Sequence, residues 1–328
     1  MATDLGLTFA VNEIDRTRPV IDGDVEIEGI DPTVLTLATP ERHRRMLKFA
    51  EFDVCELSLG SYLASVGGDY PFTAIPAFPY RRFRHGYYFV NADAGIDEPA
   101  DLEGGRVGVR RWQNTAGVWM RGIAEEYHGV DTTTVEWLVD DEDEIPVDVP
   151  DAYDVSRVSG DRNINDLLVD GDLDAIMYPG RPSAFQRGDP NVELLFPDYA
   201  AVDRRYYRDT GHFPLMHVIV VRDDVAAEHP WVPTSVRKAF EAANRQAIAE
   251  VASLVETRPS LAWAQDRLGD EYDVLGTERE LWTDGLAGVR DELETFVDYA
   301  VRDGLLAESV DVTDLFFERS LEALPETV

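Results

Sequence analysis

Two of the six histidines stand beside apolar strand patterns, where an imidazole could do acid–base chemistry. His85 follows Arg84 at the start of an aromatic run, and His217 lies inside the apolar run 215–221. An unperturbed imidazole changes charge at about pH 6.5, so this residue type suits proton transfer near neutrality. His85 and His217 are therefore our candidate catalytic residues. A histidine bonded to the backbone is the structural alternative for each.

Three arginines are candidate clamps for a carboxylate. Arg16 lies in the polar loop after the first predicted strand, Arg84 precedes the first candidate histidine, and Arg181 follows a predicted strand. The planar guanidinium matches a carboxylate with two parallel hydrogen bonds. In a chain this rich in acidic residues the alternative is a surface ion pair, which we favour for Arg81 and Arg82.

Polar residues also stand where helices are predicted to begin. Ser58, Ser61, Asn114 and Thr115 combine hydroxyl or amide groups with free backbone N–H groups, which together could bind an anion. Capping of the helix explains Ser58 and Asn114 equally well. Tyr178 could stack on an aromatic ligand, and ordinary core packing is its alternative.

Alternating strands and helices must position these side chains. Strands are predicted at 5–11, 34–37, 53–57 and 72–78, with helices at 40–50 and 58–64 between them. This order predicts an α/β fold, in which ligands bind at the carboxyl ends of the strands. Helical spacing returns over 225–262 and 281–301.

Two strands are predicted to cross between two lobes. Residues 87–91 are the expected crossing into a second lobe, and residues 215–221 are the expected return. The sequence therefore predicts a discontinuous first lobe, 1–90 plus 215–328, on which the C-terminal helices pack. Residues 91–214 form an inserted second lobe. Such a clamp holds a small molecule in its central cleft.

The charge balance excludes several classes of partner. The chain carries 64 acidic and 30 basic residues, a net charge of −34, so it lacks a basic face for nucleic acid or for anionic lipid. Aromatic residues make up 10% of the chain, which argues against disorder. A halophilic cytosol fits this surface, because the Debye length at molar salt is only about 3 Å.

Cysteine and histidine spacing predicts neither a metal nor a cofactor. Cys55 is the sole cysteine, so no intrachain disulfide or thiolate cluster can form. There is no His-x-His pair, and a site built from His85, His212 and His217 is the weaker alternative. We see no secretion signal and no apolar run of membrane-spanning length, so we expect a soluble cytoplasmic protein.

Three segments carry a resemblance to one family. They are FDVCELSLGSYL (52–63), IPAFP with FRH (75–79 and 83–85), and GHFPLMH followed by EHPWV (211–217 and 228–232). Together they resemble the 4,5-dihydroxyphthalate decarboxylase family, whose fold is similar to type 2 periplasmic binding proteins. The resemblance covers nearly the whole chain in order. His212 departs from the pattern, which usually has an aliphatic residue there. Segment 99–109 is shared widely by solute-binding proteins and supports only the fold.

The resemblance implies a decarboxylase that acts on a hydroxylated aromatic di-acid such as 4,5-dihydroxyphthalate. The ring itself can take up charge while a proton is delivered to the carbon that bears the carboxylate, so no electron-sink cofactor is needed. His85→Ala is expected to abolish CO2 release. The alternatives are a carboxylate-binding receptor or sensor without catalysis, and another enzyme of the same fold acting on a different carboxylated compound.

Overall fold

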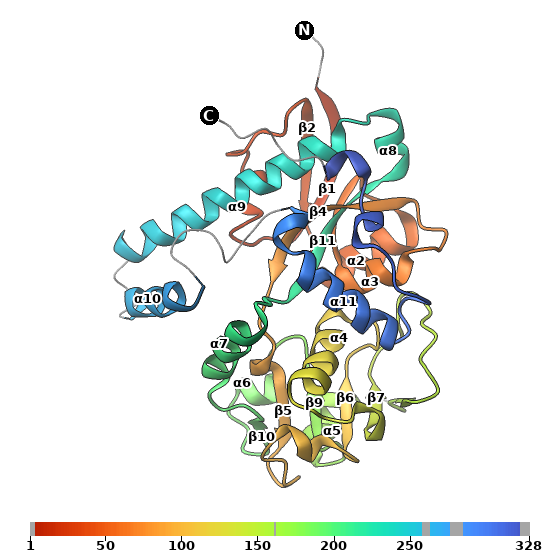
Figure 1. Ribbon diagram of the computed structural model, residues 1–328, viewed down its shortest axis with the longest axis vertical. Coiled ribbons are helices and arrows are strands. Elements are labelled where there is room, and N and C mark those ends of the chain that lie inside the picture. Colours follow the sequence, from red (N-terminus) through yellow and green to blue (C-terminus); the bar gives the residue numbers. More distant parts are fainter. Residues whose placement is uncertain (1–3, 161, 258–262, 276–284, 322–328) are drawn as a thin grey trace.

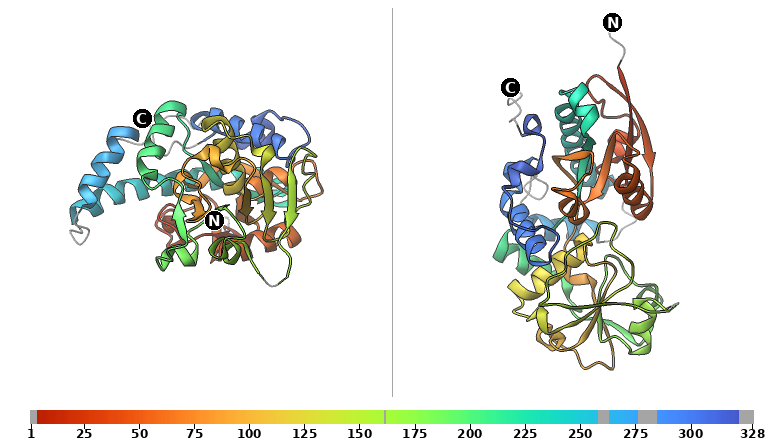
Figure 2. Two further views of the ribbon diagram at one scale, coloured as in Figure 1. Left: turned by 90° about the horizontal axis from the view of Figure 1, so that it is seen from below. Right: turned by 90° about the vertical axis from the view of Figure 1, so that its right-hand side faces the viewer.

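The computed structural model describes residues 4–160, 162–257, 263–275 and 285–321, and these form two lobes stacked along the long axis (Figure 1). Each lobe is built around one β-sheet with helices on both faces, as the α/β pattern predicted. The right-hand view of Figure 2 shows the same two lobes from the side.

The first sheet has the order β2-β1-β3-β11-β4. Its strands are β1 (Leu5–Val11), β2 (Ile30–Thr36), β3 (Val54–Ser58), β4 (Phe72–Arg81) and β11 (Leu215–Arg222). β1 pairs parallel with β2 and β3, whereas β11 runs antiparallel between β3 and β4. The carboxyl ends of β1 to β4 therefore meet the beginning of β11 at one edge of the sheet.

The second sheet has the order β10-β5-β9-β6-β7-β8. Its strands are β5 (Tyr88–Asn91), β6 (Arg106–Val109), β7 (Glu136–Val139), β8 (Asp154–Arg157), β9 (Ala175–Met177) and β10 (Val192–Leu194). β6 to β9 are parallel, and β5 runs antiparallel to β9 and β10.

Helices cover both sheets. The helices that precede β5 or follow β10 in the chain, apart from α7, are α1 (Arg18–Ile21), α2 (Thr39–Phe49), α3 (Leu59–Ser65), α8 (Asp223–Glu228), α9 (Val232–Thr257), α10 (Ala264–Leu275) and α11 (Arg290–Arg302). The helices that belong to the second lobe are α4 (Thr115–Gly122), α5 (Ile164–Asp170), α6 (Ser183–Gln186) and α7 (Tyr199–Thr210). Short helical turns occupy His85–Tyr87, Pro99–Leu102, Ile123–Tyr127, Thr132–Thr134, Leu286–Gly288, Val312–Leu315 and Glu318–Ser320.

The chain passes between the lobes twice, and the two passages lie side by side. One passage connects β4 to β5 and the other connects α7 to β11. The backbone N–H of Arg82 in the first donates to the carbonyl of Pro214 in the second, at 3.0 Å.

The predicted crossing strands need correction. Residues 88–91 pair inside the second sheet, and residues 215–222 pair inside the first. The turns that precede these strands make the crossings, because an apolar strand gains its backbone partners only within a sheet. A lobe boundary after residue 90 would cut through β5.

Alternating side chains divide the core into layers. On β1, Phe9 and Val11 face a cluster completed by Phe240 of α9, while Ala10 faces the opposite cluster with α2 and α3. In the second lobe, α5 covers one face of the sheet and α4 the other. The two lobes share the cluster that contains α3 and α4.

The C-terminal helices reach further than predicted. α9 packs on the first sheet, but α11 contacts both α3 and α4, and α10 contacts α7 of the second lobe. Predicted helical residues 258–262 and 281–284 lie outside the described residues. Within the described part, no helix combines the length and apolarity that a bilayer crossing requires.

Candidate functional site

A cavity of about 280 Å³ lies where the edges of the two sheets face each other. This size is near the lower end of the roughly 300–1,000 Å³ typical of small-molecule sites. The first lobe and its crossing contribute Asn12, Thr39, Pro40, His43, Ser58, Tyr80, Arg84, Met216 and His217. The second lobe contributes Arg110, Asn114, Thr115, Ala116, Pro179 and Gly180. We call this the interlobe cavity.

His217 faces the cavity with a buried carboxylate behind it. Its Nδ1 lies 2.5 Å from Oε1 of Glu56, whose side chain is fully buried. The register explains the contact: His217 pairs with Ser58 on β3, so Glu56 is its diagonal neighbour on the same face. The bond to Nδ1 leaves Nε2 as the nitrogen available to the cavity.

The charge of Glu56 is stabilised from several sides. Burial opposes ionisation, but the Arg42 guanidinium, 3.4 Å away, and the hydrogen bond with His217 outweigh it and lower the pKa of Glu56 to about 2. The backbone N–H of Asn12 adds a hydrogen bond of 2.7 Å. A permanent negative charge therefore stands behind His217 and orients its imidazole ring through Nδ1.

His43 of α2 lies edge-on to His217, with 5.1 Å between the ring centroids. Burial and the nearby charges of His217, Arg42 and Arg111 hold its pKa well below the usual value. Its Nε2 is buried and has no hydrogen-bond partner. The cavity thus contains a neutral imidazole, His43, beside the imidazole that is bonded to Glu56.

Arg84 brings an uncompensated positive charge to the cavity. Its side chain stacks on Tyr87 at 4.2 Å from the ring centroid, and its Nε donates to the carbonyl of Phe83. Its buried Nη2 has no partner, and no carboxylate pairs with it among the described residues. Burial lowers its pKa to about 10, so it remains protonated at neutral pH.

The rest of the lining is also suited to an anion. Arg110, paired with Asp141 at 3.2 Å, brings a second guanidinium to the rim. None of the described residues that line the cavity is acidic, in a chain with 64 acidic residues. The local excess of positive charge favours a carboxylate ligand.

Hydroxyl groups join the two lobes beside the cavity. Ser58 and Thr115 share a hydrogen bond of 2.7 Å between their hydroxyls, and Gly60 N–H donates to Thr115 at 2.8 Å. Asn114 caps α4 by accepting from backbone N–H groups. Ser58 is therefore a bridge between lobes and makes no side-chain cap. Ser61 accepts from Gln113 and does not line the cavity.

The structure places His85 elsewhere, which corrects the expectation that both candidate histidines face one cleft. His85 is fully buried, with Nδ1 bonded to Asp203 of α7 at 2.7 Å and Nε2 3.1 Å from Nε2 of His128. Tyr206 and Phe196 pack on its ring. Burial, with the nearby charge of His85, lowers the pKa of His128 to about 4.

Three further candidates also lie outside the cavity lining. Arg16 is buried and donates to the carbonyls of Phe78 and Pro79, so it ties the loop after β1 to β4. Tyr178 packs against the apolar core of the second lobe. Arg181 donates to the hydroxyl of Tyr199, although its neighbours Pro179 and Gly180 line the cavity.

The weaker metal alternative is not supported by the geometry. His85 is bonded to Asp203 and His128, His217 to Glu56, and His212 lies near Trp119. Within the ranges that the structure describes, no group of three or more potential ligands is arranged to hold an ion.

Sequence reasoning missed His43, Glu56 and Arg110. An acidic residue inside the apolar strand pattern 52–57 was an available signal for Glu56, because an unpaired carboxylate is rarely buried. His43 gave no comparable signal, since one polar residue on a helix is ordinary.

The chain is similar to two curated proteins, one of which matches almost its whole length. It is 36% identical over 326 residues to the 4,5-dihydroxyphthalate decarboxylase of Comamonas testosteroni, covering 97% of this chain and 98% of that protein. A protein of the same name from Pseudomonas putida is 36% identical over 211 residues, which are 62% of this chain and 82% of that one. No family model matches the chain.

Solved structures with the same fold include solute-binding proteins. The periplasmic aliphatic sulphonate binding protein SsuA of Escherichia coli aligns with a TM-score of 0.53 at 11% identity, covering 100% of this chain and 94% of that one. The alkanesulfonate-binding protein SsuA of Xanthomonas axonopodis pv. citri, bound to MOPS, aligns with a TM-score of 0.51 at 11% identity, covering 96% and 98%. These likenesses show a fold of the periplasmic-binding-protein type.

Proposed function

We propose, from the premise that this chain belongs to the 4,5-dihydroxyphthalate decarboxylase family, that it removes CO2 from a hydroxylated aromatic dicarboxylate held in the interlobe cavity. The observation that carries the proposal is the Glu56–His217 pair beside an unpaired Arg84, in a lining without acidic residues. This arrangement supplies a proton donor and a carboxylate clamp in one place.

Arg84 binds a substrate carboxylate and fixes the ring. The free protein leaves Arg84 Nη2 buried without a hydrogen-bond partner, and a substrate carboxylate supplies the missing acceptor. Arg110, on the opposite lobe, can hold the second carboxylate. Ligands that bridge the lobes in this way also position the ring between them.

His217 then delivers the proton. His217, held in place by the bond between its Nδ1 and Glu56, gives its Nε2 proton to the ring carbon that bears the carboxylate. The bond from that carbon to the carboxylate breaks, its electron pair returns to the ring, and CO2 leaves. His217 regains a proton from solvent, so the net reaction consumes one proton and releases one CO2.

His43 assists by binding the substrate hydroxyl that is para to the departing carboxylate. In 4,5-dihydroxyphthalate each hydroxyl is para to a carboxylate, so electron density released by that hydroxyl reaches the carbon being protonated. The neutral His43 Nε2 has no protein partner and can accept a hydrogen bond from the hydroxyl. The two adjacent histidines thus act as acid and acceptor.

The test measures headspace CO2 and ring deuteration with 4,5-dihydroxyphthalate in D2O. The wild-type product should carry deuterium at the vacated carbon, in excess of a sample without protein. His217→Gln should lower kcat by roughly 100-fold or more. The matched control His229→Gln removes a partly exposed histidine outside the cavity lining and should leave kcat unchanged.

Absence of CO2 release from a panel of hydroxylated aromatic carboxylates would contradict the proposal. Ligand binding without catalysis would instead raise the melting temperature and return the ligand unchanged. Turnover of another carboxylate by the same residues would identify a different enzyme of this fold.

A further inference from the structure

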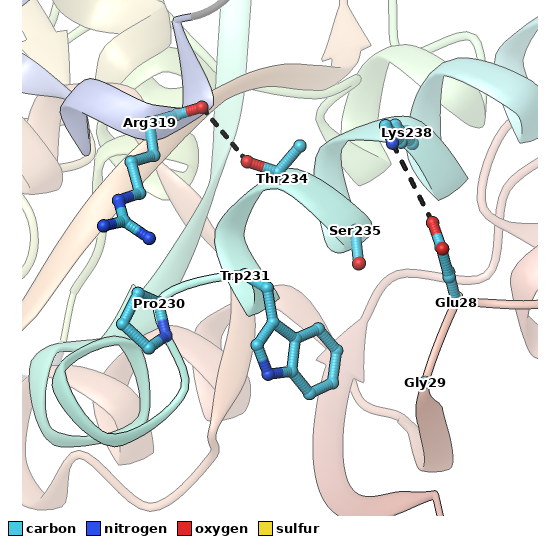
Figure 3. A pocket seen from close by; sticks show the side chains of 8 residues that line it. All are labelled: Glu28, Gly29, Pro230, Trp231, Thr234, Ser235, Lys238 and Arg319. Atoms are coloured by element: carbon cyan, nitrogen blue, oxygen red, sulfur yellow. Dashed lines mark hydrogen bonds and ion pairs between the residues drawn. The ribbon is translucent and has the colours of Figure 1, made fainter.

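A second cavity, of about 480 Å³, opens on the outer face of the first lobe where α9 begins (Figure 3). Its lining comprises Glu28, Gly29, Pro230, Trp231, Thr234, Ser235, Lys238 and Arg319. None of these residues lines the interlobe cavity. The segment EHPWV, which carried part of the family resemblance, therefore contributes to a place that the proposed reaction does not use. We call this the outer cavity.

Trp231 provides the outer cavity with a flat apolar surface. It is 40% exposed, one of few large apolar side chains with such exposure in the described chain. Part of its ring lies against Gly29, where an added Cβ would approach within 3.1 Å of the ring. The backbone of Gly29 thus supports the indole from one side, and the remaining surface is open to a ligand.

Two basic side chains stand at the outer cavity with weak or no neutralisation. Lys238, one of only two lysines, lies 3.8 Å from Glu28, and both side chains are exposed. An exposed ion pair of this kind contributes little to the free energy of folding. The Arg319 guanidinium has no ion pair or hydrogen bond within the described ranges, whereas its backbone carbonyl accepts from Thr234. Two cations against one carboxylate leave a local positive excess on a strongly acidic protein.

Ser235 adds a hydroxyl without a hydrogen-bond partner among the described residues. Only 6% of this residue is exposed, it lines the outer cavity, and no hydrogen bond of its hydroxyl is found in the described part of the chain. It lies in the first turn of α9, a helix of 26 residues whose N-terminal dipole favours an anion. A ligand oxygen would satisfy this hydroxyl.

We propose that the outer cavity binds a small aromatic carboxylate at a site separate from the interlobe cavity. The ring lies on Trp231, and the carboxylate accepts from the Ser235 hydroxyl with Lys238 and Arg319 as counter-charges. An aliphatic or inorganic anion lacks the flat surface that Trp231 recognises. This binding requires no catalysis.

The experiment titrates phthalate, which lacks ring hydroxyls, into the full-length protein by calorimetry. Arg84→Gln is the background, because it disables the clamp of the interlobe cavity. This variant should still bind one phthalate per chain. Adding W231A, or adding K238Q with R319Q, should weaken that binding at least 10-fold. The matched control adds R187Q, an exposed arginine of the second lobe, and should change nothing.

Three results would overturn the proposal. They are no phthalate binding to the Arg84→Gln protein, binding that W231A and the charge variants leave intact, and inorganic phosphate binding as tightly as phthalate. None of them depends on CO2 release, so failure of this site and failure of the proposed reaction are separate outcomes.

Discussion

Glu56→Gln tests the electrostatic core of the interlobe cavity. The substitution keeps the shape of the side chain and removes the charge that faces His217 and Arg42. The fold holds the pKa of Glu56 at about 2, against 4.5 for an ordinary glutamate. At about 1.36 kcal/mol per pKa unit, this difference corresponds to about 3 kcal/mol of stability at neutral pH.

The sign of the pH dependence follows from the lowered pKa. The contribution of Glu56 is fully present above pH 4.5 and is lost as the pH falls toward 2. Urea unfolding at pH 7 should therefore show a loss of about 3 kcal/mol for the variant. The difference from wild type should shrink below pH 4.5.

Activity should respond in a way that a purely structural role would not produce. Without Glu56 the Nδ1 of His217 loses the carboxylate that orients its ring, so kcat should fall while KM changes little. The control Glu136→Gln breaks an exposed pair with Arg106 and should cost less than about 1 kcal/mol. If both variants unfold alike and kcat of the Glu56→Gln protein does not fall, the reasoning about Glu56 is wrong.

Three further outcomes are expected. Arg84→Met should stabilise the free protein by up to about 3 kcal/mol, because burial lowers the pKa of Arg84 from 12.5 to about 10 and the penalty is fully present at any pH below 10. The same variant should raise KM roughly 10- to 100-fold, and an unchanged KM would remove Arg84 from the site. His85→Gln should lower unfolding stability by about 1–3 kcal/mol with kcat nearly unchanged, and a large loss of kcat would return His85 to the mechanism. Raising KCl from about 0.1 M to about 1 M should raise the melting temperature as the Debye length falls from about 10 to about 3 Å, and a flat response would argue against halophilic adaptation.

The strands and the first helices were predictable because their signals are local. The strand expected at 5–11 is β1, and the helix expected at 40–50 is α2, displaced by one residue. Apolar periodicity and proline in the first turn suffice for such elements. Residues at strand ends, such as Ser58 and Arg84, could also be placed near a cleft, since ligand sites in α/β folds lie there.

His85 and His217 show where local signals stop. Both stand at the junction of the lobes beside an apolar strand, and nothing nearby distinguishes them. α7 supplies Asp203 to His85 from 118 positions along the chain, whereas β3 supplies Glu56 to His217 from 161 positions away. Of these four residues, His217 is the one that lines the interlobe cavity.

The amino-acid sequence alone determined the α/β class, the paired lobes and the family, because hydrophobic periodicity and motif order are properties of neighbouring residues. Tertiary structure decided which imidazole faces the ligand and which guanidinium stays unpaired. Those outcomes depend on burial and on charges brought together by sheet pairing, and a linear pattern contains neither quantity.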